Sequence, residues 1–142
     1  MAVLPKNYLK YSEKIMLRLA TENDLPHIAR IAGSLKKQLG YVMNVALTDA
    51  QKKNWLLYHP DGAFCNFRLR RDGITVIYEI ATFGKARKKG IGRQMIEKLP
   101  KPIQLKCPVD NKSNGFYKHL GFKLVEVQDG KKRKLNVWRL EE

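Results

Sequence analysis

Two kinds of spacing between apolar residues divide this chain into short elements. Alternation of apolar with polar residues, or a run rich in β-branched and aromatic residues, predicts strands, at 15–19, 63–69, 74–83, 103–107, 122–127 and 135–140. Apolar residues spaced three and four apart predict helices, at 24–38, 48–58, 91–99 and 113–120. The predicted order, β α α β β α β α β β, describes an α/β chain with a mixed sheet rather than a doubly wound one.

The boundaries of these elements carry suitable residues. Gly40 and Gly121 follow predicted helices, where glycine adopts the left-handed conformation without steric cost. Residues 59–62 (His-Pro-Asp-Gly) and 71–73 (Arg-Asp-Gly) read as turns. The strand at 74–83 is almost wholly apolar or neutral, so we expect it in the centre of the sheet.

No repeat or linker interrupts the pattern, which predicts a single domain over 1–142 with a loose arm at 1–14. Hydrophobic residues make up 44% of the chain, a globular composition. The apolar runs are too short to span a membrane and no signal peptide is apparent, so we expect a cytoplasmic protein. Cys65 and Cys107 lie in apolar strand patterns, which predicts reduced thiols in the core.

Positive charge dominates the chain, with a formal net charge of +15. The excess is spread over several basic runs, at 36–37, 52–53, 70–71, 85–93 and 131–134. Such a surface attracts acidic or nucleic-acid-associated partners, although a solvated basic surface without any partner explains the same composition. The three histidines, His27, His59 and His119, have no metal-ligand spacing, so no metal is expected.

The most specific local signal is the stretch 87–93, Arg-Lys-Lys-Gly-Ile-Gly-Arg, between the strand at 74–83 and the helix at 91–99. Glycines allow close approach of backbone to a ligand, and a helix start favours anions. This combination predicts a phosphate-binding turn. A P-loop is excluded because no Gly-Lys-Ser/Thr follows, and a dinucleotide fingerprint because Met95 stands where a third glycine is needed.

A second stretch, 111–122, reads Asn-Lys-Ser-Asn-Gly-Phe-Tyr-Lys-His-Leu-Gly-Phe. The first stretch resembles the Arg/Gln-x-x-Gly-x-Gly/Ala pyrophosphate motif of the GNAT superfamily of acyl-CoA-dependent N-acetyltransferases. The second resembles the Tyr-x-x-x-Gly-Phe helix end of that family. The specific part of the resemblance covers 76–123, and the element order extends it over nearly the whole chain. It implies a single-domain, mixed, mostly antiparallel sheet flanked by helices, with acetyl-CoA as cosubstrate.

The resemblance also implies which residues hold the cosubstrate. Backbone groups of Ala81, Thr82 and Phe83 would bond its pantetheine arm. The pyrophosphate would be held by the glycine turn, namely Arg87, Lys88, Lys89, Gly90, Ile91, Gly92 and Arg93. Asn111 matches an asparagine that contacts the CoA arm. It stands six residues before Tyr117 instead of the common seven, so Asp110 and Asn114 remain alternatives.

Two residues are candidates for acid–base chemistry. Glu79 lies in the nearly apolar central strand, where a raised pKa would suit a general base; the alternative is a carboxylate paired with a neighbouring basic residue. Tyr117 matches the family's tyrosine, which protonates the leaving thiolate; the alternative is a packed core aromatic. Neither cysteine lies in a nucleophile pattern.

These features predict an N-acetyltransferase that moves an acetyl group from acetyl-CoA directly to a primary amine in a ternary complex. The acceptor is unknown, and the basicity of the chain favours an acidic or polyanion-associated one. The alternative is a basic nucleic-acid-binding module on an acyltransferase-like scaffold. Relatives of this kind often form homodimers, but no segment here indicates one.

Overall fold

The computed structural model describes residues 16–142. The predicted arm at 1–14, and Ile15 at the start of the first predicted strand, lie outside the described residues. The strands of the described chain are β1 (Arg18–Leu19), β2 (Leu56–His59), β3 (Ala63–Leu69), β4 (Thr75–Thr82), β5 (Ile103–Pro108), β6 (Lys123–Asp129) and β7 (Lys134–Leu140). They form one sheet in the order β1-β2-β3-β4-β5-β7-β6.

This sheet confirms the predicted mixed, mostly antiparallel architecture. Among the described strands, β4 and β5 form the one parallel pair, and every other neighbouring pair is antiparallel. The strand predicted to be central is β4, which occupies the middle of the order. Its parallel neighbour β5 is reached through α4, as parallel pairing requires a crossover connection.

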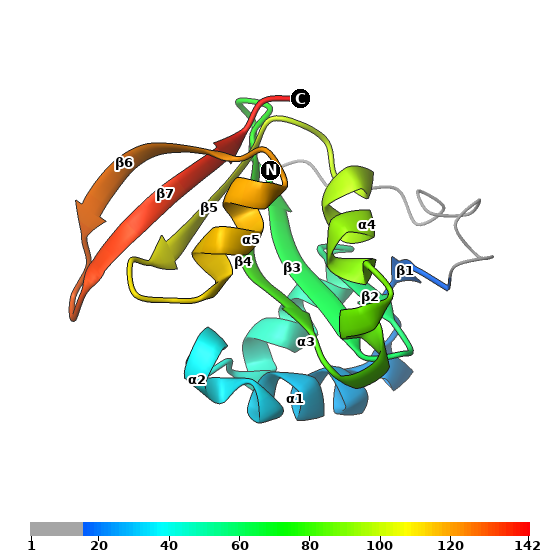
Figure 1. The fold of residues 1–142 in the computed structure, drawn as a ribbon. Coiled ribbons are helices and arrows are strands. Elements are labelled where there is room, and N and C mark those ends of the chain that lie inside the picture. The colour runs from blue at the N-terminus through cyan, green and yellow to red at the C-terminus, as the bar shows by residue number, and fades with distance from the viewer. Residues whose placement is uncertain (1–15) are drawn as a thin grey trace.

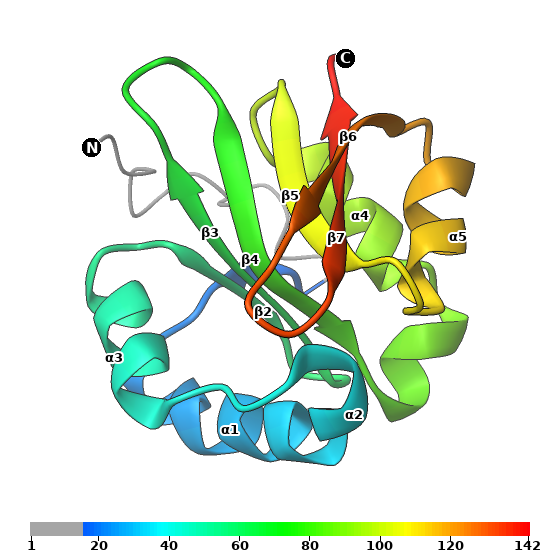
Figure 2. The same cartoon turned by 90° about the vertical axis from the view of Figure 1, so that its left-hand side faces the viewer.

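Helices cover both faces of the sheet. The helical elements are η2 (Glu22–Asp24), α1 (Leu25–Ser34), α2 (Lys36–Leu39), α3 (Asn44–Lys52), η3 (Gly84–Lys88), α4 (Ile91–Lys98) and α5 (Ser113–His119). The first three α-helices lie together on one side, and α4 and α5 lie on the other (Figures 1 and 2). Within 16–142, no helix combines the length and apolar character needed to cross a membrane.

One predicted element is wrong. The helix expected over 48–58 runs instead from Asn44 to Lys52, and Leu56–His59 forms strand β2. All four β2 residues are buried between β1 and β3. A short strand buried on both faces has no alternation, so periodicity cannot separate it from a helix. Counting strands and α-helices, the observed order is β α α α β β β α β α β β.

The helix predicted over 24–38 is divided in the structure. Leu35 leaves helical geometry, with φ −113° and ψ 28°, and separates α1 from α2. Gly40 then ends α2 with a φ of +75°, as its position predicted. The division turns Lys36–Leu39 into a short separate helix beside β4 and the β6–β7 hairpin in Figure 2.

The two central strands separate partway along their length. Pairing of β4 with β5 covers three residue pairs and ends at Ile77 with Leu105. The register between β3 and β4 shifts at the same level, because Asn66 faces Glu79 and the next residue, Phe67, faces Ile77. Tyr78 is therefore the extra residue of a β-bulge, a device that bends a strand and increases its twist.

The apolar core fills the space between the sheet and its helices. Its members include Phe64 and Phe67 of β3 and Met95 of α4, all fully buried. Cys65 and Cys107 are buried and free, in agreement with their prediction as core thiols. This packing fixes the elements that surround the gap between β4 and β5.

Candidate active site

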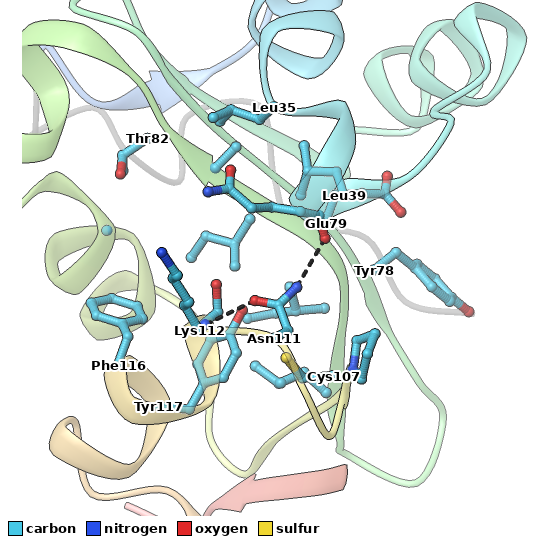
Figure 3. A pocket seen from close by; sticks show the side chains of 18 of the residues that line it. Leu35, Leu39, Tyr78, Glu79, Thr82, Cys107, Asn111, Lys112, Phe116 and Tyr117 are labelled. Carbon is cyan, nitrogen blue, oxygen red and sulfur yellow. Dashed lines mark hydrogen bonds between the residues drawn. The ribbon is translucent and has the colours of Figure 1, made fainter. Parts of the chain in front are cut away.

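The gap between β4 and β5 opens into a cavity of about 690 Å³. Its walls come from α2, from β4 and β5, from the start of α4 and from the start of α5. Figure 3 shows the side chains of Glu79, Asn111 and Tyr117 around this space, together with Leu35 and Leu39 of the α1–α2 side. Segments far apart in sequence thus meet at the place where the two strands separate.

The part of β4 beyond the bulge offers a strand edge to this cavity. Residues from Glu79 to Thr82 keep their antiparallel partners in β3 but have no β5 residue opposite them. Ala81 and Thr82, which the family resemblance implies as backbone contacts for the cosubstrate, line the cavity. Phe83 differs, because it does not line the cavity and its N–H donates to the Gly62 carbonyl at 2.8 Å.

The predicted glycine turn forms the start of α4. Gly90 adopts the left-handed conformation, with φ +69°, directly before Ile91, the first helical residue. An added Cβ would meet nothing within 4 Å there, so the conformation and not crowding requires glycine. At Gly92 a Cβ would lie 3.2 Å from Phe116 Cζ and 3.6 Å from Thr82 Cγ2. Gly92 therefore lets α4 lie close to α5 and β4.

The basic residues of this turn do not all reach the cavity. Arg87 and Arg93 line it, together with Gly90, Ile91 and Gly92. Lys89 does not line it, and its ammonium group pairs with Asp61 at 2.6 Å. Lys88 contributes its backbone to η3. The arrangement joins free N–H groups of a helix start with guanidinium groups, which is suited to binding a phosphate.

Glu79 is half-buried on β4 and has a defined partner. Its Oε1 accepts a 2.9 Å hydrogen bond from Nδ2 of Asn66, the residue opposite it on β3. Burial raises the pKa of the Glu79 carboxyl above its ordinary value, although the Asn66 bond and the nearby Arg68 charge oppose the rise. Such a carboxylate accepts a proton more readily than an exposed one does.

Asn66 is held in turn by Arg68, and neither residue is part of a motif that sequence analysis could single out. The guanidinium of Arg68 donates to Asn66 Oδ1 at 2.6 Å and to the Phe67 carbonyl at 2.7 Å. Because Oδ1 accepts from Arg68, the amide must present Nδ2 to Glu79. Their alternation with apolar residues predicted a polar face of β3, but Asn66 is only 2% exposed.

The Arg68 guanidinium is enclosed by two aromatic rings. It lies 4.2 Å from the ring centroid of Trp55 and 5.1 Å from that of Tyr78. Contacts of this kind favour the cation and restrict its rotamers. Tyr78 is the bulged residue, and it both lines the cavity and contacts Arg68. The stacked arginine therefore lies next to the site.

Tyr117 of α5 points into the cavity from the side opposite Glu79 (Figure 3). Its ring is 7% exposed and makes edge contacts with Phe116 and Phe122. Burial raises the pKa of the Tyr117 phenol well above its ordinary value, with Cys107 contributing. The hydroxyl therefore stays protonated near neutral pH and can donate a proton or a hydrogen bond.

Asn111, Asp110 and Asn114, the three candidates for contact with the CoA arm, lie in different surroundings in the structure. Asn111 lines the cavity, where its Nδ2 donates to the Gln38 carbonyl at 3.1 Å and its Oδ1 accepts from the Ser113 N–H at 2.8 Å. Asn114 does not line it. Its Nδ2 donates to Pro108 at 2.8 Å, and its Oδ1 accepts from Trp138 at 2.8 Å.

Asp110 also lies outside the cavity lining and faces Arg133 at 3.7 Å. Of the three candidates, only Asn111 has its side chain at the cavity. Asn114 instead fastens the start of α5 to β5 and β7.

Two of the histidines have structural partners. Nδ1 of His27 lies 2.6 Å from the Tyr58 hydroxyl, and Nδ1 of His59 accepts from the Asp61 N–H at 3.0 Å. His119 is exposed at the end of α5. Over 16–142, no group of three or more metal-ligating side chains comes together.

The arrangement of elements is similar to that of solved acetyltransferases. Ard1 from Thermoplasma volcanium has a TM-score of 0.73 at 16% identity, covering 88% of this chain and 95% of that one. The ribosomal-protein-S18-alanine N-acetyltransferase from Escherichia coli has a TM-score of 0.69 at 16% identity, covering 88% and 92%. An acetyltransferase of the GNAT family from Bacillus cereus has a TM-score of 0.70 at 10% identity, covering 89% and 96%.

In sequence, no family model and no curated protein matches the chain. The similarity is therefore one of fold, and it extends over nearly the whole of both partners in each comparison.

Proposed function

Because this chain has the fold of the GNAT N-acetyltransferases, we propose that it transfers an acetyl group from acetyl-CoA to a primary amine. One observation carries the proposal. The two central strands separate around a cavity that has a glycine-led helix start at one end and both Glu79 and Tyr117 in its walls. The helix start suits the phosphates of a thioester cosubstrate. Glu79 and Tyr117 suit the removal of a proton from an amine and the donation of a proton to a leaving group.

The residues present suit coenzyme A. The N–H groups at the start of α4, with Arg87 and Arg93, would hold its pyrophosphate, since they supply donors and positive charge without an opposing carboxylate in the lining of that end. The free edge of Ala81 and Thr82 would bond the amide groups of its arm, much as a neighbouring strand would. Asn111 is the side chain placed to bond the same arm.

Bound acetyl-CoA would supply the activated acetyl thioester. Glu79 takes the proton from the acceptor amine, directly or through a water molecule, with Oε1 as the atom that Asn66 orients. Arg68 fixes the Asn66 amide and thereby keeps Glu79 in one position. The pKa raised by burial brings this base closer to neutrality than an exposed carboxylate.

Tyr117 donates its phenolic proton to the leaving sulfur, and its high pKa ensures that the proton is present when it is needed. A backbone N–H near Ala81, on the open edge of β4, is the candidate donor to the oxygen that gains negative charge. Cys65 and Cys107 are buried with pKa values raised by burial, so neither thiol is poised as a nucleophile and direct transfer is favoured.

Ligand-induced stabilisation tests the proposal. Acetyl-CoA should raise the thermal midpoint of the protein, by the equivalent of about 2.7 kcal/mol at a hundredfold excess over Kd. Arg93→Glu should remove this stabilisation, because it replaces a lining cation with an anion at the start of α4. Lys123→Glu, at an exposed position outside the cavity lining, is the control with the same change in net charge. A protein whose midpoint ignores acetyl-CoA would contradict the proposal.

A further inference from the structure

Basic residues line the cavity at two separate places. Arg87, Arg93 and Lys112 lie by the starts of α4 and α5, where the phosphates of coenzyme A are proposed to bind. A second group consists of Lys36 and Lys37 on α2, Lys106 on β5 and Arg133 in the β6–β7 turn. The cosubstrate phosphates explain the first group and leave the second without a role.

The strand register places Lys106 on the same face of the sheet as Glu79. Thr82 faces α4, because a Cβ at Gly92 would touch it. Glu79 lies three residues earlier, so alternation directs it to the opposite face. On β5, Cys107 is paired with Asn136, whose side chain donates to Asn114 of α5. Cys107 therefore shares the face of α4 and α5, and its neighbour Lys106 shares the face of Glu79.

This second face is also the one covered by α1 and α2 (Figures 1 and 2). Lys36 and Lys37 are exposed on α2, and the β6–β7 turn that carries Arg133 borders the same cavity. Arg133 has a long 3.7 Å contact with Asp110, and both side chains are largely exposed, so this pair contributes little. Among the described lining residues, Glu79 is the one acidic side chain.

We propose that the acceptor is an amine carried by an anionic molecule, whose carboxylate or phosphate groups are recognised by Lys36, Lys37, Lys106 and Arg133 while the amine meets Glu79. The inference rests on the proposed acetyl transfer. In that step the amine nitrogen forms a bond to the acetyl carbon and the carbon–sulfur bond breaks. Glu79 takes one amine proton, and the sulfur receives the proton of Tyr117.

Electrostatics favours this class of acceptor over a polyamine. A polycation would approach four cations with a single carboxylate to offset them, and like charges placed together oppose binding. An anionic molecule is attracted by the same four cations, which also raises its rate of association with the protein. Two sources share the required chemistry: an acidic peptide with a free α-amine and a small amine bearing a carboxylate or phosphate.

The test compares acceptors of opposite charge. Peptides with the same first residue, followed by glutamates or by lysines, are assayed with acetyl-CoA by thiol release, alongside glutamate, phosphoethanolamine and spermidine. We expect transfer to the acidic peptide or the small anionic amines, and the arm that reacts identifies the source. Preferred transfer to the lysine peptide or to spermidine would overturn the inference and leave the proposed function standing.

Charge-reversed variants localise the effect. Lys36→Glu with Lys37→Glu should raise KM for the anionic acceptor by about tenfold or more and leave KM for acetyl-CoA unchanged. Lys52→Glu with Lys123→Glu, at exposed positions outside the cavity lining, is a control with the same change in net charge. Equal effects of the two double variants would show that only overall charge matters and would overturn the inference.

Binding is measured in parallel, so that the result does not depend on finding the best acceptor. With coenzyme A present, the acidic peptide should bind more tightly than the lysine peptide, and the α2 variant should weaken it selectively. If acetyl-CoA itself fails to stabilise the protein, the proposed function fails. If acetyl-CoA binds and the two peptides bind alike, the inference alone is wrong.

Discussion

Asn66 donates a 2.9 Å hydrogen bond from Nδ2 to Oε1 of Glu79, its partner across the β3–β4 pair. The bond crosses at the level of the bulge, where β4 separates from β5. It holds the carboxylate that we propose as the base at one position in the cavity wall. It also favours the ionised form of that carboxylate.

Removing this partner should move the pH profile upward. In Asn66→Ala, burial still raises the pKa of Glu79, and the bond that opposed it is gone. The limb of kcat/KM that rises with pH should therefore shift to higher pH, as measured by thiol release at saturating acetyl-CoA. Asn23→Ala, at an exposed position in η2, should leave the profile unchanged. An unshifted limb in Asn66→Ala would mean that Glu79 is not the titrating base.

Glu79→Gln should make the protein more stable and less active. A carboxyl with a raised pKa binds its proton more tightly in the folded state, so stability falls as pH rises from its ordinary pKa of 4.5 through the raised value. The cost is fully present at pH values above the raised pKa, and glutamine removes it while its side-chain oxygen can still accept from Asn66. We expect a gain of roughly 0.5–2 kcal/mol at pH 7, measured by denaturant unfolding. The gain should disappear in acid.

Tyr117→Phe should reduce turnover without weakening acetyl-CoA binding. The ring contacts with Phe116 and Phe122 are retained, so the packing of α5 is unchanged. Loss of the donated proton should lower kcat by about a hundredfold or more. The thermal shift with acetyl-CoA provides the control. Parallel losses in turnover and in that shift would indicate that the tyrosine only packs.

Asn111 and Asn114 should respond differently to alanine. Asn114→Ala leaves the buried Trp138 indole N–H without its acceptor and frees the Pro108 carbonyl, so unfolding should cost about 2–4 kcal/mol less. Asn111→Ala should instead weaken acetyl-CoA binding, with a smaller change in stability. Urea unfolding and the acetyl-CoA thermal shift, measured on both variants, separate the two roles. Equal destabilisation would contradict the assignment.

The sequence predicted local features of this molecule well. The glycine turn and the helix that follows it depend on neighbouring residues, and Gly90 and α4 lie where the pattern indicated. The boundaries of β3 were also correct. Strand β2 was missed because its four buried residues show no period, and only pairing with β1 and β3 makes it a strand.

The site depended more on tertiary structure. Asn66 and Arg68 appear in sequence as the polar side of an alternating strand, and their role follows from a partner thirteen positions away. From their spacing to Tyr117, Asn111 and Asn114 were both candidates for contact with the cosubstrate. Their different hydrogen-bond partners in the structure distinguish them. Lys89 belongs to the motif by sequence, yet Asp61 attracts its side chain away from the cavity.

Only three residue pairs join β4 to β5, so the sheet consists of two parts that are hydrogen-bonded to each other near one end. Strands β1 to β4 form one part and β5 to β7 form the other, and no other strand pairing connects the two parts in the described chain. A molecule bound along the open edge of β4 would contact both parts and restrict their motion relative to each other. Amide hydrogen exchange in β4 beyond Tyr78 should then slow on binding, which makes these backbone protons a direct reporter of occupancy.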